Sequence, residues 1–361
     1  MSCWGNGFRS FSTAASRSIS QPNSFQVFRD VPKLRQLRRQ LLQNDRTVGF
    51  VPTMGALHEG HLALIREAAR ENTDIFVSIF VNPTQFGVNE DLSSYPRTWD
   101  SDLGKLEKLN EELESSDDGV GKGRITAIFA PTSKVMYPAL PPSSEIYGDG
   151  SFITITPISK KLEGASRPVF FRGVATVCMK LFNITTPDRV YFGQKDVQQS
   201  VVIKRMVEDF HIGTEVRIVN TTRQADGLAL SSRNVYLGDR RRAVGLSMFT
   251  ALKAAEEAYL SGKTSREDIL GAARSVTERV LSEQKTLSPS ERALFEVDYI
   301  SLADPQSLDE LDLVESSKGA VLSAALKMAP LEETRPNEDC GLGDGKVPVR
   351  LIDNIILQPR E

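Results

Sequence analysis

The sequence is poor in histidine and cysteine and balanced in charge, and the last two of these features each exclude a class of protein. Only three histidines and three cysteines occur in 361 residues. Cys3, Cys178 and Cys340 are odd in number and far apart, so they do not form the disulfide framework of a small secreted domain. Lys and Arg number 44 against 47 Asp and Glu, which gives a net charge of −3. Because a nucleic-acid-binding protein needs a basic footprint, we expect a small-molecule partner instead.

Long apolar runs are also missing, and so are acidic residues near the start. No run approaches the ~20 residues that cross a bilayer, so we expect no membrane association. The first 29 residues contain Arg9, Arg17, Arg29 and several serines but no acid. This composition is typical of an organellar transit peptide, and a disordered tail has the same composition. Both a mitochondrial and a cytoplasmic location therefore stay open, and residues 1–24 are left out of the predicted fold.

The rest of the chain has the length and the 40% apolar content of two globular domains. In the first, residues 25–221, helices alternate with strands. The helices are predicted over 31–41, 61–70, 100–113, 174–183 and 197–210, and the strands over 47–51, 75–81, 125–130, 189–192 and 215–219. This alternation predicts an α/β fold with a Rossmann-like, doubly wound parallel sheet. Ligands bind at the carboxyl ends of such strands, so the loops after Val51, Val81 and Phe192 should share one cleft.

Residues 222–361 are predicted to form a smaller C-terminal α+β domain that acts as a lid. Its helices are expected over 240–260 and 266–283, and its strands over 296–302, 320–327 and 347–352. Two further segments, 107–123 and 330–346, are rich in charge, glycine or proline. Their composition favours mobile, solvated loops over binding sites.

The segment from Pro52 to His61 leaves a buried strand, turns at Gly55 and enters a helix. Such a junction directs backbone N–H groups and the positive end of the helix at an anion. His58 and His61, three residues apart, lie on the same side of the first turn and can donate hydrogen bonds to phosphate oxygens. A metal site is the alternative, but the spacing is one residue shorter than in the zinc pattern His-Glu-x-x-His. His211 is the only other histidine.

Polar side chains also follow two other predicted strands. Asn82 and Gln85 carry amides that bind hydroxyl and carboxylate groups, although Asn-Pro also begins ordinary turns. After the strand that ends at Phe192, Lys195 is placed to meet a phosphate as a point charge. Asp196 either caps the following helix or faces the site, and Gln199 lies one turn into that helix.

The segment from Asp226 to Asn234 lies at the predicted domain junction. Ser231, Ser232 and Arg233 place two hydroxyls and a guanidinium in a row. Such a group can clamp a polyphosphate as one domain closes on the other. On its own, the run is also compatible with a plain polar turn.

Together these four segments resemble the pantothenate synthetase family of the nucleotidylyltransferase superfamily. The resemblance begins at about Phe25, covers nearly the whole chain outside 107–123 and 330–346, and includes the stretches 95–98 and 172–183. The chain departs from the family pattern at Phe170, where many members have histidine, so no role is assigned there. Leu230 replaces the commoner Met, which conserves volume.

The resemblance implies an ATP-dependent ligase that joins (R)-pantoate to β-alanine through a pantoyl-adenylate, releasing AMP and pyrophosphate. It implies functional roles for His61 as proton donor and for His58, Lys195 and Arg233. The ATP site would comprise Met54, Gly55, His58, Gly60, His61, Gly193, Gln194, Lys195, Asp196, Thr222, Leu230, Ser231, Ser232 and Arg233. Pantoate and β-alanine would meet Gln85, Gln199 and Asn82. Mg²⁺ would accompany ATP on ligands not identified, with Asp102 a weak candidate, and the family suggests a homodimer.

Two other functions stay open at this stage. One is a nucleotidylyltransferase that leaves AMP on a phosphorylated, pantetheine-like product; the uncharged amides Gln85 and Gln199 favour a small carboxylate instead. The other is a nucleotide-binding regulatory module without turnover, against which His58, His61 and Lys195 argue.

Overall fold

The computed structural model describes residues 25–88, 92–93, 95–115, 123–139 and 143–360. The predicted targeting or disordered segment 1–24 lies outside these residues. Within the described ranges, every helix is too short or too polar to span a membrane. Cys178 is a buried free thiol, and burial raises its pKa to about 12, as expected of an inert core residue.

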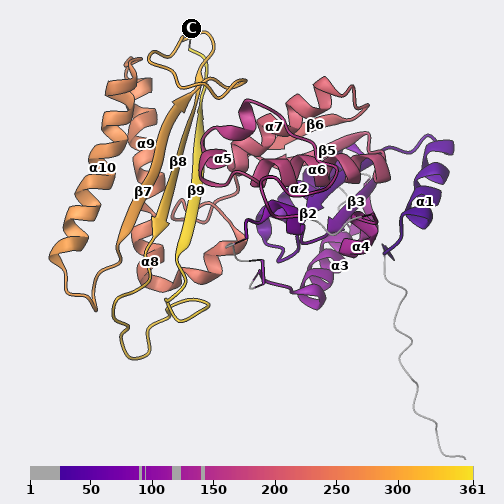
Figure 1. Ribbon diagram of the computed structural model, residues 1–361, viewed down its shortest axis with the longest axis horizontal. Coiled ribbons are helices and arrows are strands. Elements are labelled where there is room, and N and C mark those ends of the chain that lie inside the picture. Colours follow the sequence, from indigo (N-terminus) through magenta and orange to yellow (C-terminus); the bar gives the residue numbers. More distant parts are fainter. Residues whose placement is uncertain (1–24, 89–91, 94, 116–122, 140–142, 361) are drawn as a thin grey trace, which may run out of the picture.

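Six parallel strands form the larger sheet, in the order β1-β4-β3-β2-β5-β6 (Figure 1). Their bounds are β1 Gln26–Phe28, β2 Val48–Thr53, β3 Asp74–Ile79, β4 Arg124–Phe129, β5 Arg189–Gly193 and β6 Glu215–Val219. The order reverses between β2 and β5, which are hydrogen-bonded neighbours. This reversal is the switch point at which parallel α/β sheets bind ligands.

Helices cover both faces of this sheet, which explains why its central strands are almost wholly buried. The main helices are α1 Val31–Gln43, α2 Glu59–Glu71, α3 Trp99–Ser115, α6 Phe170–Thr185 and α7 Val197–Asp209. One core cluster joins α1, α6 and α7 to one face, and another joins α2 and α3 to the other. The doubly wound parallel sheet predicted from the sequence is thereby confirmed.

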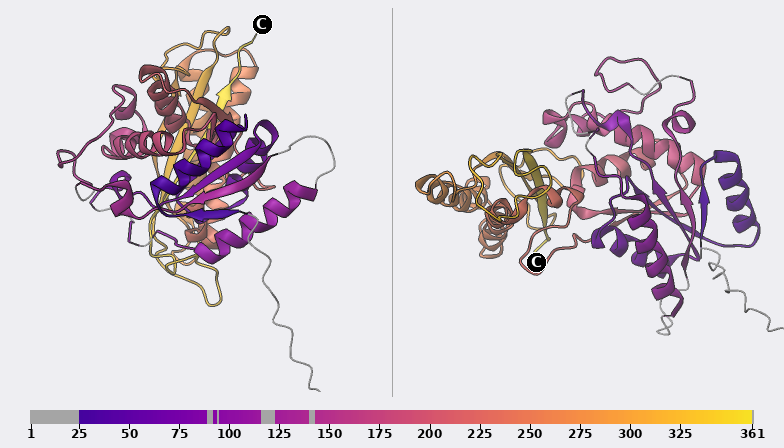
Figure 2. Two further views of the ribbon diagram at one scale, coloured as in Figure 1. Left: turned by 90° about the vertical axis from the view of Figure 1, so that its right-hand side faces the viewer. Right: turned by 90° about the horizontal axis from the view of Figure 1, so that it is seen from below.

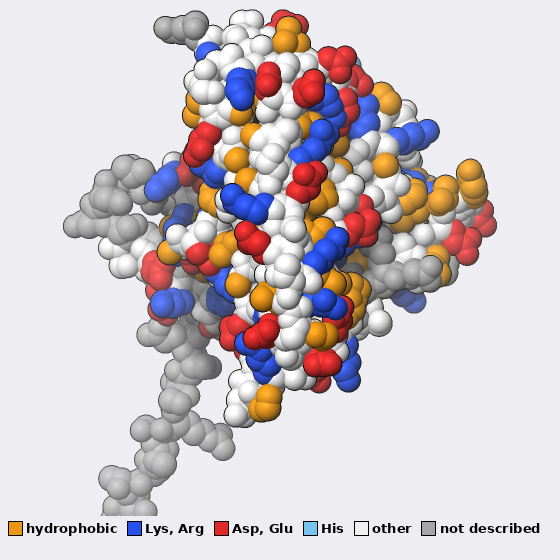
Figure 3. All heavy atoms as spheres, turned by 90° about the vertical axis from the view of Figure 1, so that its left-hand side faces the viewer, with side chains coloured by type: hydrophobic (Ala, Val, Ile, Leu, Met, Phe, Trp, Pro, Cys, Tyr) orange, Lys and Arg blue, Asp and Glu red, His pale blue; other side chains and the backbone are white. Residues whose placement is uncertain are grey.

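Three long antiparallel strands form a second sheet in the order β7-β8-β9 (Figure 2). They are β7 Phe295–Ala303, β8 Ala320–Met328 and β9 Val349–Leu357. Helices α9 (Ser247–Leu260) and α10 (Arg266–Thr286) pack on one face of it. The outward side of this layer carries interspersed acidic and basic side chains (Figure 3). The other face of this sheet is turned to the larger sheet, and Val321 and Ile356 join the core of the larger sheet.

The structure corrects several predicted boundaries. The short edge strand β1 was not predicted. The helix expected over 240–260 is two helices, α8 (Gly238–Gly245) and α9, separated at Leu246. The strand expected to end at 352 continues to Leu357, because Ile355 and Ile356 extend its apolar pattern.

The two predicted mobile loops are also corrected. Residues 107–115 belong to helix α3, whereas 116–122 lie outside the described residues. Residues 330–346 have no helix or strand, but they are fixed onto α8 by two arginines. Arg240 pairs with Glu338 and holds the pKa of that carboxyl at about 2. The buried Arg241 donates to the carbonyl of Cys340 at 3.2 Å.

Candidate active site

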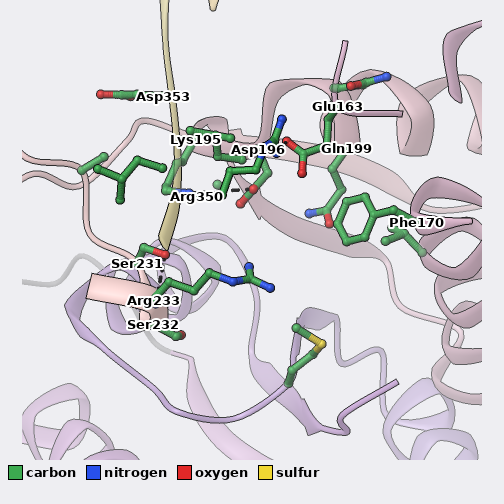
Figure 4. A pocket seen from close by; sticks show the side chains of 18 of the residues that line it. Glu163, Phe170, Lys195, Asp196, Gln199, Ser231, Ser232, Arg233, Arg350 and Asp353 are labelled. Atoms are coloured by element: carbon green, nitrogen blue, oxygen red, sulfur yellow. Dashed lines mark hydrogen bonds and ion pairs between the residues drawn. The ribbon is translucent and has the colours of Figure 1, made fainter. Parts of the chain in front are cut away.

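A cavity of about 920 Å³ lies at the carboxyl ends of β2, β3 and β5 and is closed on one side by β9 (Figure 4). Its volume is at the upper end of ordinary ligand pockets, about 300–1,000 Å³. The loops after Val51, Val81 and Phe192 all border it. The prediction that these three loops share one cleft is confirmed.

The loop after β2 is held by its own histidines. His58 is the N-cap of α2, and its Nδ1 accepts a hydrogen bond from the backbone N–H of Gly60 at 3.1 Å. His61 Nδ1 accepts from the backbone N–H of His58 at 3.3 Å, so the two rings form a reciprocal capping box. A side chain at position 60 would approach the His58 ring to 2.8 Å, and Gly55 has a φ of +85°. Both glycines are required by this tight entry into the helix.

Both imidazoles are neutral in the ligand-free protein. Burial lowers the pKa of His58 to about 4, helped by the positive charge of Lys195. Burial, together with the neighbouring His58 and Lys105, lowers the pKa of His61 to about 3. Since each Nδ1 accepts a backbone hydrogen bond, the proton of each neutral ring lies on Nε2. The pair therefore offers two uncharged donors.

Asp102 fixes the same loop from helix α3. Its carboxylate is 1% exposed and accepts from the backbone N–H groups of Ala56 at 2.9 Å and Leu57 at 2.8 Å. Thr98 Oγ1 donates a third bond at 3.1 Å. Because its oxygens are taken by protein donors, Asp102 supports the histidine loop and is not available as the Mg²⁺ ligand considered from the sequence.

The amides after β3 form a network of their own. Asn82 donates to Gln85 Oε1 and to the carbonyl of Gly173, each at 3.1 Å, and its oxygen accepts from Tyr137 at 2.6 Å. Gln85 then donates to Met54 Sδ at 3.2 Å. The amide of Asn82 is thus fully engaged by protein groups and holds Gln85, whose amide borders the cavity.

The turn between β5 and α7 carries the cationic side of the site. Lys195 lies 4.0 Å from the carboxylate of Asp196, and both side chains border the cavity beside Gln199. Asp196 occupies the N-cap position of α7, but its side chain makes no capping hydrogen bond. Of the two roles considered for Asp196, helix capping is therefore excluded, and its carboxylate faces the site (Figure 4).

The Ser231–Arg233 loop approaches from the opposite side. Ser232 Oγ donates to the carbonyl of Ala56 at 3.2 Å, which ties this loop to the histidine loop. Ser231 Oγ accepts from the backbone N–H of Arg233 at 3.3 Å and caps the short helix η4 (Ser232–Tyr236). Arg233 extends from there toward the middle of the cavity (Figure 4).

A further wall was not predicted from the sequence. The Arg167 guanidinium lies 3.9 Å from the centre of the Phe170 ring and donates to the carbonyl of Gln85 at 3.4 Å. Glu163, from the short helix α5 (Glu163–Ser166), pairs with Arg167 at 3.2 Å and with Arg350 of β9 at 2.5 Å. No local motif marks a lone arginine in a strand, so Arg350 gave no signal. Arg167 lies just before the stretch 172–183 that resembles the family, so the family pattern was the available signal for it.

The cavity brings together nearly all of the residues proposed from the sequence. Those that border it are Met54, His58, Gly60, His61, Asn82, Gln85, Gly193, Lys195, Asp196, Gln199, Thr222, Leu230, Ser231, Ser232 and Arg233. Gly55 and Gln194 do not border it. Gly55 shapes the turn, and Gln194 directs its amide at Asn354 of β9, at 3.2 Å.

The fold and the cavity together define an α/β enzyme with its ligand site at the switch point of a parallel sheet. The family model of pantoate-β-alanine ligases matches residues 26–356. A pantothenate synthetase of Roseiflexus castenholzii is 42% identical over 311 residues, which cover 86% of this chain and 92% of that protein. The chain belongs to the pantoate–β-alanine ligase family, whose enzymes act in pantothenate biosynthesis.

Solved structures agree with this assignment. The pantothenate synthetase of Thermus thermophilus superposes with a TM-score of 0.70 at 34% identity, covering 93% of this chain and 100% of that one. The pantoate-β-alanine ligase of Francisella tularensis, in complex with β-γ ATP and β-alanine, gives a TM-score of 0.64 at 29% identity. That match covers 92% of this chain and 97% of the other.

Proposed function

We propose that the protein joins pantoate to β-alanine in this cavity, in two steps. The carboxylate of pantoate attacks the α-phosphorus of ATP, and pyrophosphate leaves. The amine of β-alanine then attacks the acyl carbon of pantoyl-adenylate, giving pantothenate and AMP. The observation that carries this proposal is the meeting of His58, His61, Lys195 and Arg233 with Gln85 and Gln199 around one cavity. The Francisella tularensis ligase, solved with β-γ ATP and β-alanine, supports the same pair of ligands here.

In the first step, negative charge grows on the phosphate oxygens that leave as pyrophosphate. Lys195 and Arg233 stabilise that charge as cations, and His58 and His61 donate neutral Nε2–H hydrogen bonds to it. Because the pKa of His61 is lowered to about 3, the ring is neutral near pH 7, so it donates its Nε2–H as a hydrogen bond and carries no second proton to transfer. Ser231 and Ser232 would close over the phosphates from the other side.

The two small substrates need orientation more than charge. Gln85 and Gln199 supply amides to pantoate, and Asn82 acts through Gln85, because its own amide is engaged by protein groups. Asp196 and the backbone around Gly193 and Thr222 would line the nucleotide.

Mg²⁺ enters this proposal with the nucleotide. Among the described residues, no group of three or more His, Cys, Asp or Glu side chains is arranged to hold a metal ion. Mg²⁺ commonly keeps several waters and binds through substrate phosphates. We therefore assign no protein ligand to it and route no step through it.

The larger organisation is also a proposal. The boundary between the nucleotide- and pantoate-binding domain and the C-terminal lid would fall near Thr221, after β6. A homodimer follows from the family resemblance, and the exposed Ile146 and Tyr147 supply apolar surface for association. Equilibrium sedimentation of the full chain tests the dimer, and localisation of a fluorescent fusion distinguishes mitochondria from cytoplasm.

The reaction is tested by measuring AMP release from ATP by the purified full chain, with pantoate present and β-alanine added or omitted. The ligase predicts AMP and pantothenate only when both substrates are present. It also predicts ATP–pyrophosphate exchange that depends on pantoate alone. AMP retained on a phosphorylated product indicates the transferase, and ATP binding without exchange indicates the regulatory module.

A further inference from the structure

The Lys195 turn is held by a residue from the second sheet. Asn354 of β9 is 1% exposed, and its Nδ2 donates to the backbone carbonyls of Gln194 and Lys195, each at 2.9 Å. Its Oδ1 accepts from Gln194 Nε2 at 3.2 Å. Both the nitrogen and the oxygen of this amide therefore bond to the turn η3 (Gln194–Asp196), which presents Lys195 to the cavity.

The preceding residue, Asp353, holds the segment that leads to the opposite loop. Its buried carboxylate pairs with Arg223 through both oxygens, at 2.5 and 2.9 Å. Arg223 also donates to the carbonyl of Gly227 at 3.1 Å and stacks on Phe249 at 4.3 Å. A bridge between Arg223 and Ala229 closes the hairpin that runs on into Ser231–Arg233.

Successive side chains of a strand point to opposite faces of its sheet. Asn354 shares the face of Arg350 and Ile356, which is turned to the first domain, whereas Asp353 lies toward α9 with Phe249. Figure 4 shows Asp353 on the other side of β9 from Arg350 and Glu163. Two neighbouring residues on one rigid strand therefore hold the loops on both sides of the cavity.

We propose that Asp353 and Asn354 are positioning residues for ATP, which fix the Lys195 turn at a set distance from the Ser231–Arg233 loop. This inference rests on the proposed function, because it takes both loops to bind the phosphates. A buried amide with directional bonds holds its partners to a narrow geometry, and a misplaced contact is costly in a transition state. Pantoate should depend on these residues less, since Gln85 is held by Asn82 from a different loop.

The test compares the charge-changing variant Asn354→Asp with the same change at Asn110. Asn110 is as deeply buried, and its amide likewise bonds backbone groups, the N–H of Ile125 at 2.7 Å and its carbonyl at 3.3 Å. It lies on α3 and does not border the cavity. In each variant, a carboxylate oxygen replaces a donor that faces a carbonyl.

For Asn354→Asp we expect the KM for ATP to rise on the order of tenfold or more, the loss that follows from one or two broken buried hydrogen bonds. The KM for pantoate should stay within about threefold of the parent value. Asn110→Asp should lower Tm comparably and leave the KM for ATP unchanged. Asp353→Asn, which keeps the shape but removes the charge that faces Arg223, should raise the KM for ATP less than Asn354→Asp.

An Asn354→Asp protein that loses stability with an unchanged KM for ATP overturns the inference, as does an equal rise in both KM values. Lys195→Met, measured beside it, separates the two proposals. If Lys195→Met raises the KM for ATP and Asn354→Asp does not, the positioning role alone fails. If neither variant affects ATP, the assignment of this turn to the phosphates fails. Should Asn354→Asp not fold, Asn354→Ser is judged by the same KM comparison.

Discussion

Two loops face each other across the switch point, and they are stabilised in different ways. The histidine loop after β2 is capped by its own rings and held by Asp102 of α3, 45 and 46 residues away in the chain. The Lys195 turn after β5 is held by Asn354, 159 and 160 residues further along the chain. The first loop supplies neutral donors, and the second supplies a cation. The main support of the first loop therefore comes from a nearby helix beside the larger sheet, whereas that of the second comes from a strand of the smaller sheet.

The largest expected effect comes from removing the cation of the second loop. Lys195→Met should lower the rate of pantoate-dependent ATP–pyrophosphate exchange on the order of 100- to 1,000-fold, because one preorganised donor at the developing charge is lost. Lys204→Met, an exposed position on helix α7, which follows this turn, is the matched control and should be neutral. An exchange rate within about threefold of the parent rate would show that Lys195 does not act in the reaction.

The histidine loop is disrupted most directly by changing the carboxylate that supports it. Asp102→Asn replaces a charged acceptor of two backbone N–H groups, so the loop should shift, and kcat/KM for ATP should fall about tenfold to 100-fold. The free energy of unfolding should fall by about 1–3 kcal/mol, which urea denaturation measures. Asp100→Asn, exposed on the same helix, should change neither quantity. A fall in stability with full activity would show that the loop does not need this support.

The neutrality of the first loop predicts its response to pH. In the unfolded chain a histidine has a pKa of about 6.5, and in the folded protein the values are about 4 for His58 and about 3 for His61. The unfolded state therefore takes up protons first, and stability falls as the pH falls below about 6.5 toward those values. Nitrogen-15 NMR of the ligand-free protein should show both rings as neutral Nε2–H tautomers at pH 6. Titration of either ring near pH 6.5, assigned by a His58→Asn variant, would contradict this.

The smallest expected effect lies outside both loops. Phe170→Leu removes the ring on which Arg167 stacks, and Arg167 donates to the carbonyl of Gln85, which is proposed to meet pantoate and β-alanine. The KM for these two substrates should therefore rise about threefold, as expected of a lost cation–π contact. The KM for ATP should be unaffected. Phe152→Leu removes a comparable stack with Arg172 at 4.1 Å, away from the cavity, and should leave these constants unchanged. A change in the KM for ATP alone would show that Phe170 acts on nucleotide binding.

Much of the fold was predictable because it depends on local pattern. The alternation of buried strands and amphipathic helices predicted the parallel sheet, and the strand-to-helix junctions at His58 and Lys195 predicted which loops meet. The sequence left two roles open for Asp196, because capping depends on the side-chain rotamer, which the neighbours of the site decide. Residues 330–346 were predicted to be mobile because their composition does not reveal that Arg240 and Arg241 fix them.

The sequence by itself determined the class of fold, the loops that border the cavity and the family of ligases. It did so because hydrophobic period, glycine turns and short polar motifs act over a few residues. The tertiary structure alone decided that Asp102 supports the histidine loop, that both imidazoles are neutral, and that Asp353 and Asn354 hold the two sides of the site. Those properties come from burial and from contacts between residues far apart in the chain, which no local pattern records.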